Sequence, residues 1–257
     1  MRVTNWQQGW TPLLWAATKK HMAIVRVLVD EGGASVLKAK ADGMTALHVA
    51  ASQNDIHLMD FVLQRAGASA VDMQTAEGWT PAHLAGFLGN MDSLNMLVDQ
   101  GADLVTKRHN HKMSCLDEIV RNDNADLLEC VFPLVKGALA KRNLKEVKSL
   151  SMTLQPGSFS LLHLAAGNQG SKCLSYLVQH AGEYVNQICN DQDRATPLHF
   201  AVLANNYDNA RFLLKNNANA NARDSVSGHR MLINLPEWKY ASSLRGCSQE
   251  PFYGPHA

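Results

Sequence analysis

Short apolar stripes with helical spacing recur along the 257-residue chain. The first two cover residues 24–29 and 58–63, and later ones cover 94–98, 127–132, 173–178 and 212–214. Apolar positions three and four residues apart place their side chains on one face of an α-helix. Each stripe lies 13 to 18 residues after the start of a second recurring segment. The pattern therefore predicts a chain built from repeated pairs of helices.

The second recurring segment begins with Thr or Ser and is rich in Leu and Ala. Residues 196–201 give its fullest form, Thr-Pro-Leu-His-Phe-Ala, and residues 114–117 an eroded one. The six copies start at Thr11, Thr45, Thr80, Ser114, Ser160 and Thr196, so the intervals are 34, 35, 34, 46 and 36 residues. Self-similarity at such a period is typical of repeat architectures, in which each unit is one supersecondary element.

These segments resemble the Thr-Pro-Leu-His-x-Ala signature of the ankyrin repeat, whose unit is about 33 residues long. The resemblance implies an all-α solenoid, an ankyrin-type stack of about six to seven helix-turn-helix units with projecting β-hairpin loops. The array is expected over residues 1–230, with units starting near residues 9, 43, 78, 112, 158 and 194. Residues that tolerate left-handed dihedrals are expected to end the second helices: Gly32, Gly67, Gly101, Gly182 and Asn217.

Two stretches depart from the period. Residues 134–153 fall in the long interval, and they read either as a degenerate helical hairpin or as an ordinary insertion. Gly228 stands where a seventh unit would begin, but Pro236 interrupts that unit. Residues 231–257 are therefore predicted to be a broken terminal unit and tail, either a capping or disordered segment or the end of a truncated array.

The composition limits the classes of partner and the cell compartments that are expected. The net charge is +1, which gives no electrostatic footprint for nucleic acid, and no apolar run is long enough to span a bilayer. Five cysteines without a Cys-x-x-Cys pair argue against a disulfide framework or a zinc site. The sequence thus favours a monomer in the cytosol or nucleus, with another protein as partner, no nucleic acid, no membrane insertion and no cofactor.

No constellation of residues in the sequence indicates catalysis. Phosphate-loop, nucleophile-elbow and zinc-protease motifs are absent, so the chain is interpreted as not an enzyme. The recurrent histidines sit on different units, too far apart to share a metal, and the resemblance assigns them to tying helices to neighbouring turns: His48, His83, His163 and His199. Cys130 and Cys173 lie on helix stripes and are expected to be buried.

The resemblance places a partner in the concave groove between the loop tips and the first helices. Large apolar residues precede five of the six signatures, namely Trp10, Met44, Trp79, Met113 and Phe159. Seven and eight residues after the third signature stand Phe87 and Leu88, so these seven residues are the predicted binding stripe. Trp15, in contrast, is expected to pack inward.

The predicted function is that of a non-enzymatic interaction module or adaptor, which binds a protein or peptide in this groove. An alternative is that the chain is the substrate-recruiting ankyrin region of a larger enzyme or membrane protein.

Overall fold

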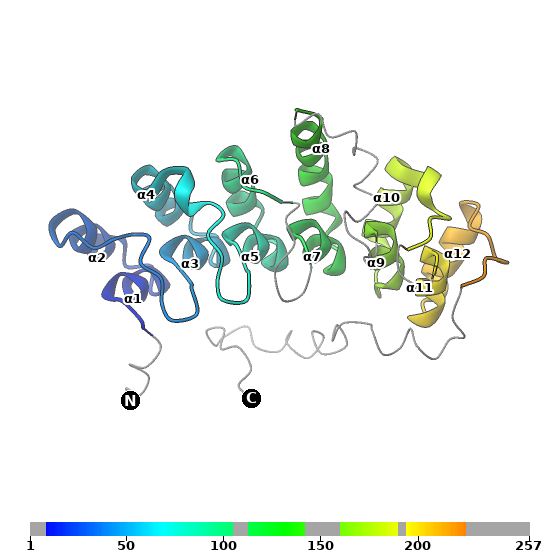
Figure 1. Ribbon diagram of the computed structural model, residues 1–257, viewed down its shortest axis with the longest axis horizontal. Coiled ribbons are helices and arrows are strands. Elements are labelled where there is room, and N and C mark those ends of the chain that lie inside the picture. Colours follow the sequence, from blue (N-terminus) through cyan, green and yellow to red (C-terminus); the bar gives the residue numbers. More distant parts are fainter. Residues whose placement is uncertain (1–8, 105–112, 142–159, 190–193, 225–257) are drawn as a thin grey trace.

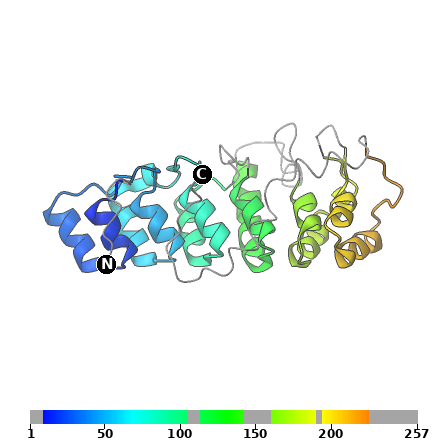
Figure 2. The same cartoon turned by 90° about the horizontal axis from the view of Figure 1, so that it is seen from below.

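The computed structural model describes residues 9–104, 113–141, 160–189 and 194–224, with the side chains of 136–141 left aside. Within these ranges the chain forms six pairs of antiparallel helices that follow one another in a single row (Figure 1). The view turned by 90° shows the same succession from blue to orange (Figure 2). Helix pairs stacked in one direction are the arrangement that the periodicity predicts, and they confirm the expected all-α solenoid.

The first helices of the six units are short and of nearly equal length. They are α1 (Pro12–Thr18), α3 (Ala46–Ser52), α5 (Pro81–Leu88), α7 (Cys115–Arg121), α9 (Leu161–Gly167) and α11 (Pro197–Leu203). Each begins directly after the signature Thr or Ser, which acts as N-cap. In α3, α5, α9 and α11 the N-cap and the His at the third helical position form a reciprocal capping box. The signature therefore specifies the start of each first helix by local hydrogen bonding.

The second helices are longer and more varied. They are α2 (Met22–Arg26), which continues as the π-helix η2 (Val27–Glu31), α4 (Ile56–Ala66), α6 (Met91–Asp99), α8 (Ala125–Lys141), α10 (Lys172–Ala181) and α12 (Tyr207–Lys215). Short 3₁₀ turns, η3 (Gly67–Ala70) and η5 (Gly182–Tyr184), follow α4 and α10. In five units a residue with positive φ separates the two helices: Lys20, Asn54, Gly89, Asp123 and Asn205. A left-handed residue there reverses the chain within a few positions.

Small residues allow the first helices to pack closely. Ala17, Ala51 and Ala85 are fully buried between neighbouring units. At Gly86 a Cβ atom would lie 2.7 Å from the Sγ atom of Cys115 in the next unit, a distance that side chains do not tolerate. Leucines from the second helices complete the core, including Leu58, Leu94, Leu127 and Leu174. The stack thus has one continuous apolar core shared by all described units.

The loops between units turn back on themselves but hold no strand in the described ranges. In the loop before α5, Thr75 N donates to Trp79 O at 2.9 Å and Gly78 N donates to Thr75 O at 2.8 Å. Ala76 N also donates to Asp42 O of the preceding loop at 2.7 Å, so neighbouring loops are bonded to each other. These loops are the projecting hairpins that the sequence predicts, reduced to tight turns.

Some expected boundaries changed. Of the five residues expected to end second helices with left-handed dihedrals, Gly67, Gly101 and Asn217 have positive φ, whereas Gly32 and Gly182 are right-handed. The described part of the range 134–153 belongs to the helix before it, because α8 runs on through Lys141 with Pro133 inside it. Residues 142–153 and the tail 231–257 lie outside the described residues.

Candidate partner-binding surface

In units two and five a buried histidine connects the first helix to the loop before the next unit. Thr45 N donates to Nδ1 of His48 at 3.2 Å, and Nε2 of His48 lies 3.0 Å from the carbonyl oxygen of Trp79. The ring therefore accepts on one side and donates on the other, as a neutral imidazole does. Burial lowers the pKa of His48 to about 4, so the neutral form persists at neutral pH. His48 thus fixes the backbone that carries Trp79, which confirms the structural role expected of this histidine.

His163 repeats the arrangement of His48 three units further along the stack. Its Nδ1 accepts from Ser160 N at 3.2 Å, and its Nε2 lies 3.0 Å from the carbonyl oxygen of Ala195. Burial lowers its pKa to about 4 as well. His48 and His163 therefore make the same link between consecutive units and belong to the structural frame.

The third unit brings together three predicted groove residues. The ring centroids of Trp79 and Phe87 lie 5.7 Å apart at an interplanar angle of 73°, an edge-to-face pair. Leu88 follows on the same helix end and is 44% exposed. Trp79 Nε1 donates to Oε2 of Glu77 at 3.3 Å on the same loop. Aromatic and aliphatic surface therefore meets at the junction of the loop and the end of α5.

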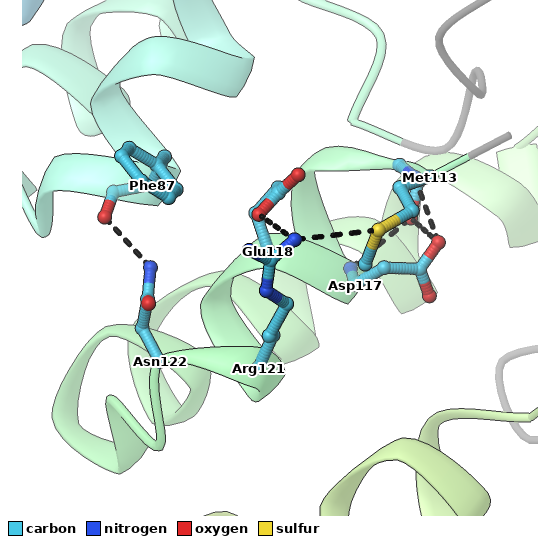
Figure 3. A network of polar contacts seen from close by, with 7 residues as sticks. Phe87, Met113, Asp117, Glu118, Arg121 and Asn122 are labelled. Atoms are coloured by element: carbon cyan, nitrogen blue, oxygen red, sulfur yellow. Dashed lines mark hydrogen bonds and ion pairs between the residues drawn. The ribbon is translucent and has the colours of Figure 1, made fainter. Parts of the chain in front are cut away.

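The neighbouring fourth unit is more polar than the sequence predicted for the groove (Figure 3). Met113 is only 8% exposed, and its Sδ atom lies 3.8 Å from Nη1 of Arg121. The same guanidinium lies 3.7 Å from Oε2 of the buried Glu118. Asn122 Nδ2 donates to the carbonyl oxygen of Phe87 at 2.7 Å and so joins units three and four. Met113 offers little surface to a partner because Arg121 covers it.

In the first two units the predicted groove residues are partly buried, whereas Trp15, which was expected to be buried, is exposed. Trp10 and Met44 are half-buried against the core. Trp10 packs on Trp15 with centroids 4.9 Å apart, and Nζ of Lys40 lies 4.9 Å from the Trp10 ring. The expectation that Trp15 packs inward is wrong, since it is 48% exposed. Its counterparts in later units are covered by a preceding unit, and among the described residues nothing precedes α1 in the stack. Phe159 lies outside the described residues.

The register places Arg121 and Asn122 at groove positions of unit four, but sequence reasoning missed Glu118 as part of this surface. Glu118 occupies the position where the other units place Trp15, Val49, Leu84, Leu164 and Phe200. A carboxylate at an otherwise apolar position was the available signal, because a buried charge requires a partner. Asp117 likewise replaces the signature histidine and accepts from Ser114 N at 2.7 Å. Unit four therefore keeps the capping geometry while changing the chemistry of the groove.

Other chemistry is sparse in the part of the chain that the structure describes. No three His, Cys, Asp or Glu side chains there gather closely enough to hold a metal ion. Cys173 is buried as expected, but Cys130 is exposed, which corrects the prediction for that residue. None of the helices in the described ranges combines the length and the apolarity needed to span a bilayer.

Comparison with curated proteins found relatives of about one quarter identity. The B-cell lymphoma 3 protein homolog of Mus musculus is 26% identical over 190 residues, which cover 73% of this chain and 39% of that protein. The nuclear factor NF-kappa-B p105 subunit of Gallus gallus is 26% identical over 65% of this chain and 16% of that protein. The NAD-dependent deacetylase sir2B of Dictyostelium discoideum is 26% identical over 47% of this chain. The match to it spans 15% of its length.

The fold has a counterpart among solved structures, and a family model covers most of the sequence. The crystal structure of the human ASB11 ankyrin repeat domain superposes with a TM-score of 0.64 at 20% identity, over 95% of this chain and all of that one. The family described as ankyrin repeats (3 copies) matches residues 2–73, 36–108 and 116–224. The chain therefore belongs to the ankyrin repeat family, whose arrays are protein–protein interaction modules.

Proposed function

We propose that this array is a non-enzymatic adaptor that binds a protein or peptide segment in its concave groove, with Trp79, Phe87 and Leu88 at the centre of the contact. The observation that carries the proposal is the edge-to-face pair of Trp79 and Phe87 beside the exposed Leu88. Aromatic side chains grouped in this way contribute most of the binding energy at protein interfaces. The partner therefore needs an apolar side chain that fits against this cluster.

The cluster is held in place before any partner arrives. The carbonyl of Trp79 is bonded to His48, its main-chain N–H donates to Oγ1 of Thr75 at 3.1 Å, and its indole is bonded to Glu77. The main chain of Phe87 is bonded to Asn122. A surface whose rotamers and loops are already ordered loses less conformational entropy on binding, so more of the contact energy appears as affinity.

Charged residues surround the apolar centre and supply a polar rim. Lys40 and Asp42 form an ion pair of 2.7 Å at the loop before α3, and Glu77 is exposed on the next loop. Arg121 borders the cluster on the side of unit four. An apolar centre with a polar rim is the usual anatomy of a transient protein interface. The proposed contact therefore keeps only Trp79, Phe87 and Leu88 of the seven residues predicted from sequence, because Met113 is covered and Trp10 packs on Trp15.

The test compares two leucines with almost equal exposure. Leu88→Asp changes the proposed centre, while Leu134→Asp changes a leucine of α8, 45% exposed, that belongs to a second helix. Peptides selected from a displayed library against the full chain are measured by fluorescence anisotropy with each variant. We expect Leu88→Asp to weaken binding at least tenfold, about 1.4 kcal/mol, and Leu134→Asp to leave it unchanged. Equal binding by wild type and Leu88→Asp would overturn the proposal.

Substrate recruitment within a larger enzyme or membrane protein, the alternative drawn from the sequence, uses the same groove. It makes the same prediction for Leu88, so the experiment tests the binding surface that both functions require.

A further inference from the structure

The first unit exposes apolar side chains at positions that later units bury. Ile24 is 50% exposed, yet the residue at the same position is buried in every other unit: Leu58, Ser93, Leu127, Cys173 and Asn209. Trp15 is 48% exposed, and its counterparts Val49, Leu84, Glu118 and Phe200 are buried. We call Trp15 and Ile24 the leading end face. At this surface the inner units contact the unit before them, and no unit among the described residues covers it.

The sixth unit shows the complementary pattern on its opposite side. Val202 is 65% exposed, whereas Ala17, Ala51, Gly86, Val120 and Ala166 at the same position are buried. Leu214 is 47% exposed, whereas its counterparts Leu63, Phe132 and Val178 are buried. We call Val202 and Leu214 the trailing end face. The described stack therefore ends on both sides in apolar surface that its inner units cover.

Contacts between inner units show how these two faces fit together. Asn209, the counterpart of Ile24, donates to the carbonyl oxygens of Ala165 and Ala166 in unit five at 3.3 and 3.2 Å. Phe200, the counterpart of Trp15, packs on His163 of unit five with centroids 5.1 Å apart. Inside the stack, the leading face of unit six therefore packs on the trailing face of unit five.

Helix capping between units is a second way in which the two end faces match each other. Where a second helix is not capped by its own turn, the preceding unit supplies the cap. Ser93 N of α6 donates to Oδ1 of Asn54 at 3.0 Å, and Cys173 N of α10 donates to Oδ1 of Asp123 at 2.8 Å. Asn54 and Asp123 both have φ near 52°. The cap is therefore a left-handed Asn or Asp between the two helices of the preceding unit.

The two ends of the stack hold the two halves of this cap. The continuous helix from Met22 to Glu31 starts at His21, whose side chain makes no capping bond. Unit six carries Asn205 with φ 53°, the same conformation as Asn54 and Asp123, and its side chain is exposed. Asn205 at the trailing end can thus cap a helix such as the one that starts after His21, which has no side-chain cap at the leading end. This match adds to that of the apolar surfaces.

We propose that the partner of these faces is a second copy of this chain, stacked head to tail so that Val202, Asn205 and Leu214 of one copy cover Trp15 and Ile24 of the next. The interface continues the one already present between units inside the chain. Its two halves differ, so the contact is heterologous and builds an open row of copies rather than a closed two-fold dimer. This assembly differs from the monomer expected from the sequence, and it is independent of the groove.

Two variants that each block one end test this arrangement in the full chain. Ile24→Asp removes the leading face and Val202→Asp removes the trailing face, and both positions are exposed enough to accept a carboxylate. In sedimentation velocity, the wild type is expected to show a weight-average mass that rises with concentration above 28.2 kDa. Each variant alone is expected to stay at the monomer mass. Their equimolar mixture is expected to reach twice that mass and no more, because only one pair of faces remains competent.

Several outcomes would overturn the proposal. A wild type that stays monomeric at every concentration refutes self-stacking, and a Val202→Asp variant that still dimerises while Ile24→Asp does not refutes the head-to-tail geometry. Far-ultraviolet circular dichroism checks that both variants keep the wild-type helix content. Leu88→Asp is the matched control, since it carries the same new charge in the groove and should associate like the wild type. Its effects on peptide binding and on association therefore separate the two proposals.

Discussion

Acidification should destabilise this protein through its buried signature histidines. His48 and His163 are fully buried, and burial lowers the pKa of each to about 4. In both, Nδ1 accepts a hydrogen bond from the main-chain N–H of the N-cap residue, so protonation would break the capping box as well as bury a charge. The unfolded chain has no such restriction, and its imidazoles titrate near 6.5.

The direction and the size of the change in the free energy of unfolding follow from these pKa values. Between pH 6.5 and 4 the unfolded state binds more protons than the folded state, so the free energy of unfolding falls as the pH falls. Each histidine contributes a slope of about 1.4 kcal/mol per pH unit in that window. From pH 6.5 to 5.0 this amounts to about 1.6 kcal/mol for one histidine and about 3 kcal/mol for the pair, because the unfolded imidazole is only half protonated at pH 6.5. Such a loss is a large part of the stability of an ordinary domain.

The assay is urea unfolding followed by circular dichroism at several pH values from 6.5 to 5.0, for the wild type and for His48→Gln. Glutamine removes one titrating group and leaves all others in place. The variant should be less stable at pH 6.5, because it loses the bond to Trp79, yet its stability should fall less steeply by about 1.4 kcal/mol per pH unit. Parallel slopes for the two proteins would refute the reasoning. A nuclear magnetic resonance titration of His48 gives its pKa directly.

Three further predictions concern the stability and accessibility of the repeat stack. Gly43→Ala should lower the free energy of unfolding by about 2 kcal/mol or more, since φ is 85° and the new Cβ would meet the backbone of the next loop at 2.8 Å. Gly33→Ala, the control with positive φ but open space, should lower it by about 1 kcal/mol in the same urea assay. Asn209→Ala should cost about 2 to 3 kcal/mol in the same assay, because its amide bonds main-chain carbonyls of unit five. A thiol reagent should modify the exposed Cys130 in the native protein and spare Cys115, which is buried with its pKa raised by desolvation; peptide mass spectrometry decides, and equal rates would contradict the structure.

Local chemistry explains why much of the fold could be predicted from sequence. The signature residues Thr45 and His48 bond to each other three positions apart, so their spacing alone specifies the start of a helix. The bond from His48 to Trp79 repeats in His163 and Ala195 because the units have nearly the same length. Contacts that repeat with the sequence period can be inferred from the period itself.

Features that depend on what lies next to a residue could not be predicted in the same way. Trp15 occupies a position that is buried in most units, and it is exposed where no described unit precedes α1. Met113 looks exposed by its register, but the guanidinium of Arg121 lies against its sulfur. Cys130 lies on an apolar stripe, yet the stripe is wider than the buried face of α8. The exposure of a groove residue is set by side chains of neighbouring units, whose rotamers the sequence pattern does not give.

The long interval between units four and five illustrates why contacts define the register better than sequence spacing. Across this 46-residue interval, Asp123 caps α10 at Cys173 by the same bond that Asn54 makes to Ser93 across a regular interval. Phe132 of α8 also packs edge-to-face on Tyr176 of α10, with centroids 5.8 Å apart. Units four and five are therefore direct neighbours in the stack. The groove consequently keeps its spacing past unit four. We expect a partner at the proposed Trp79 contact to continue along α7 and α9, with contacts that follow the structural period of the stack.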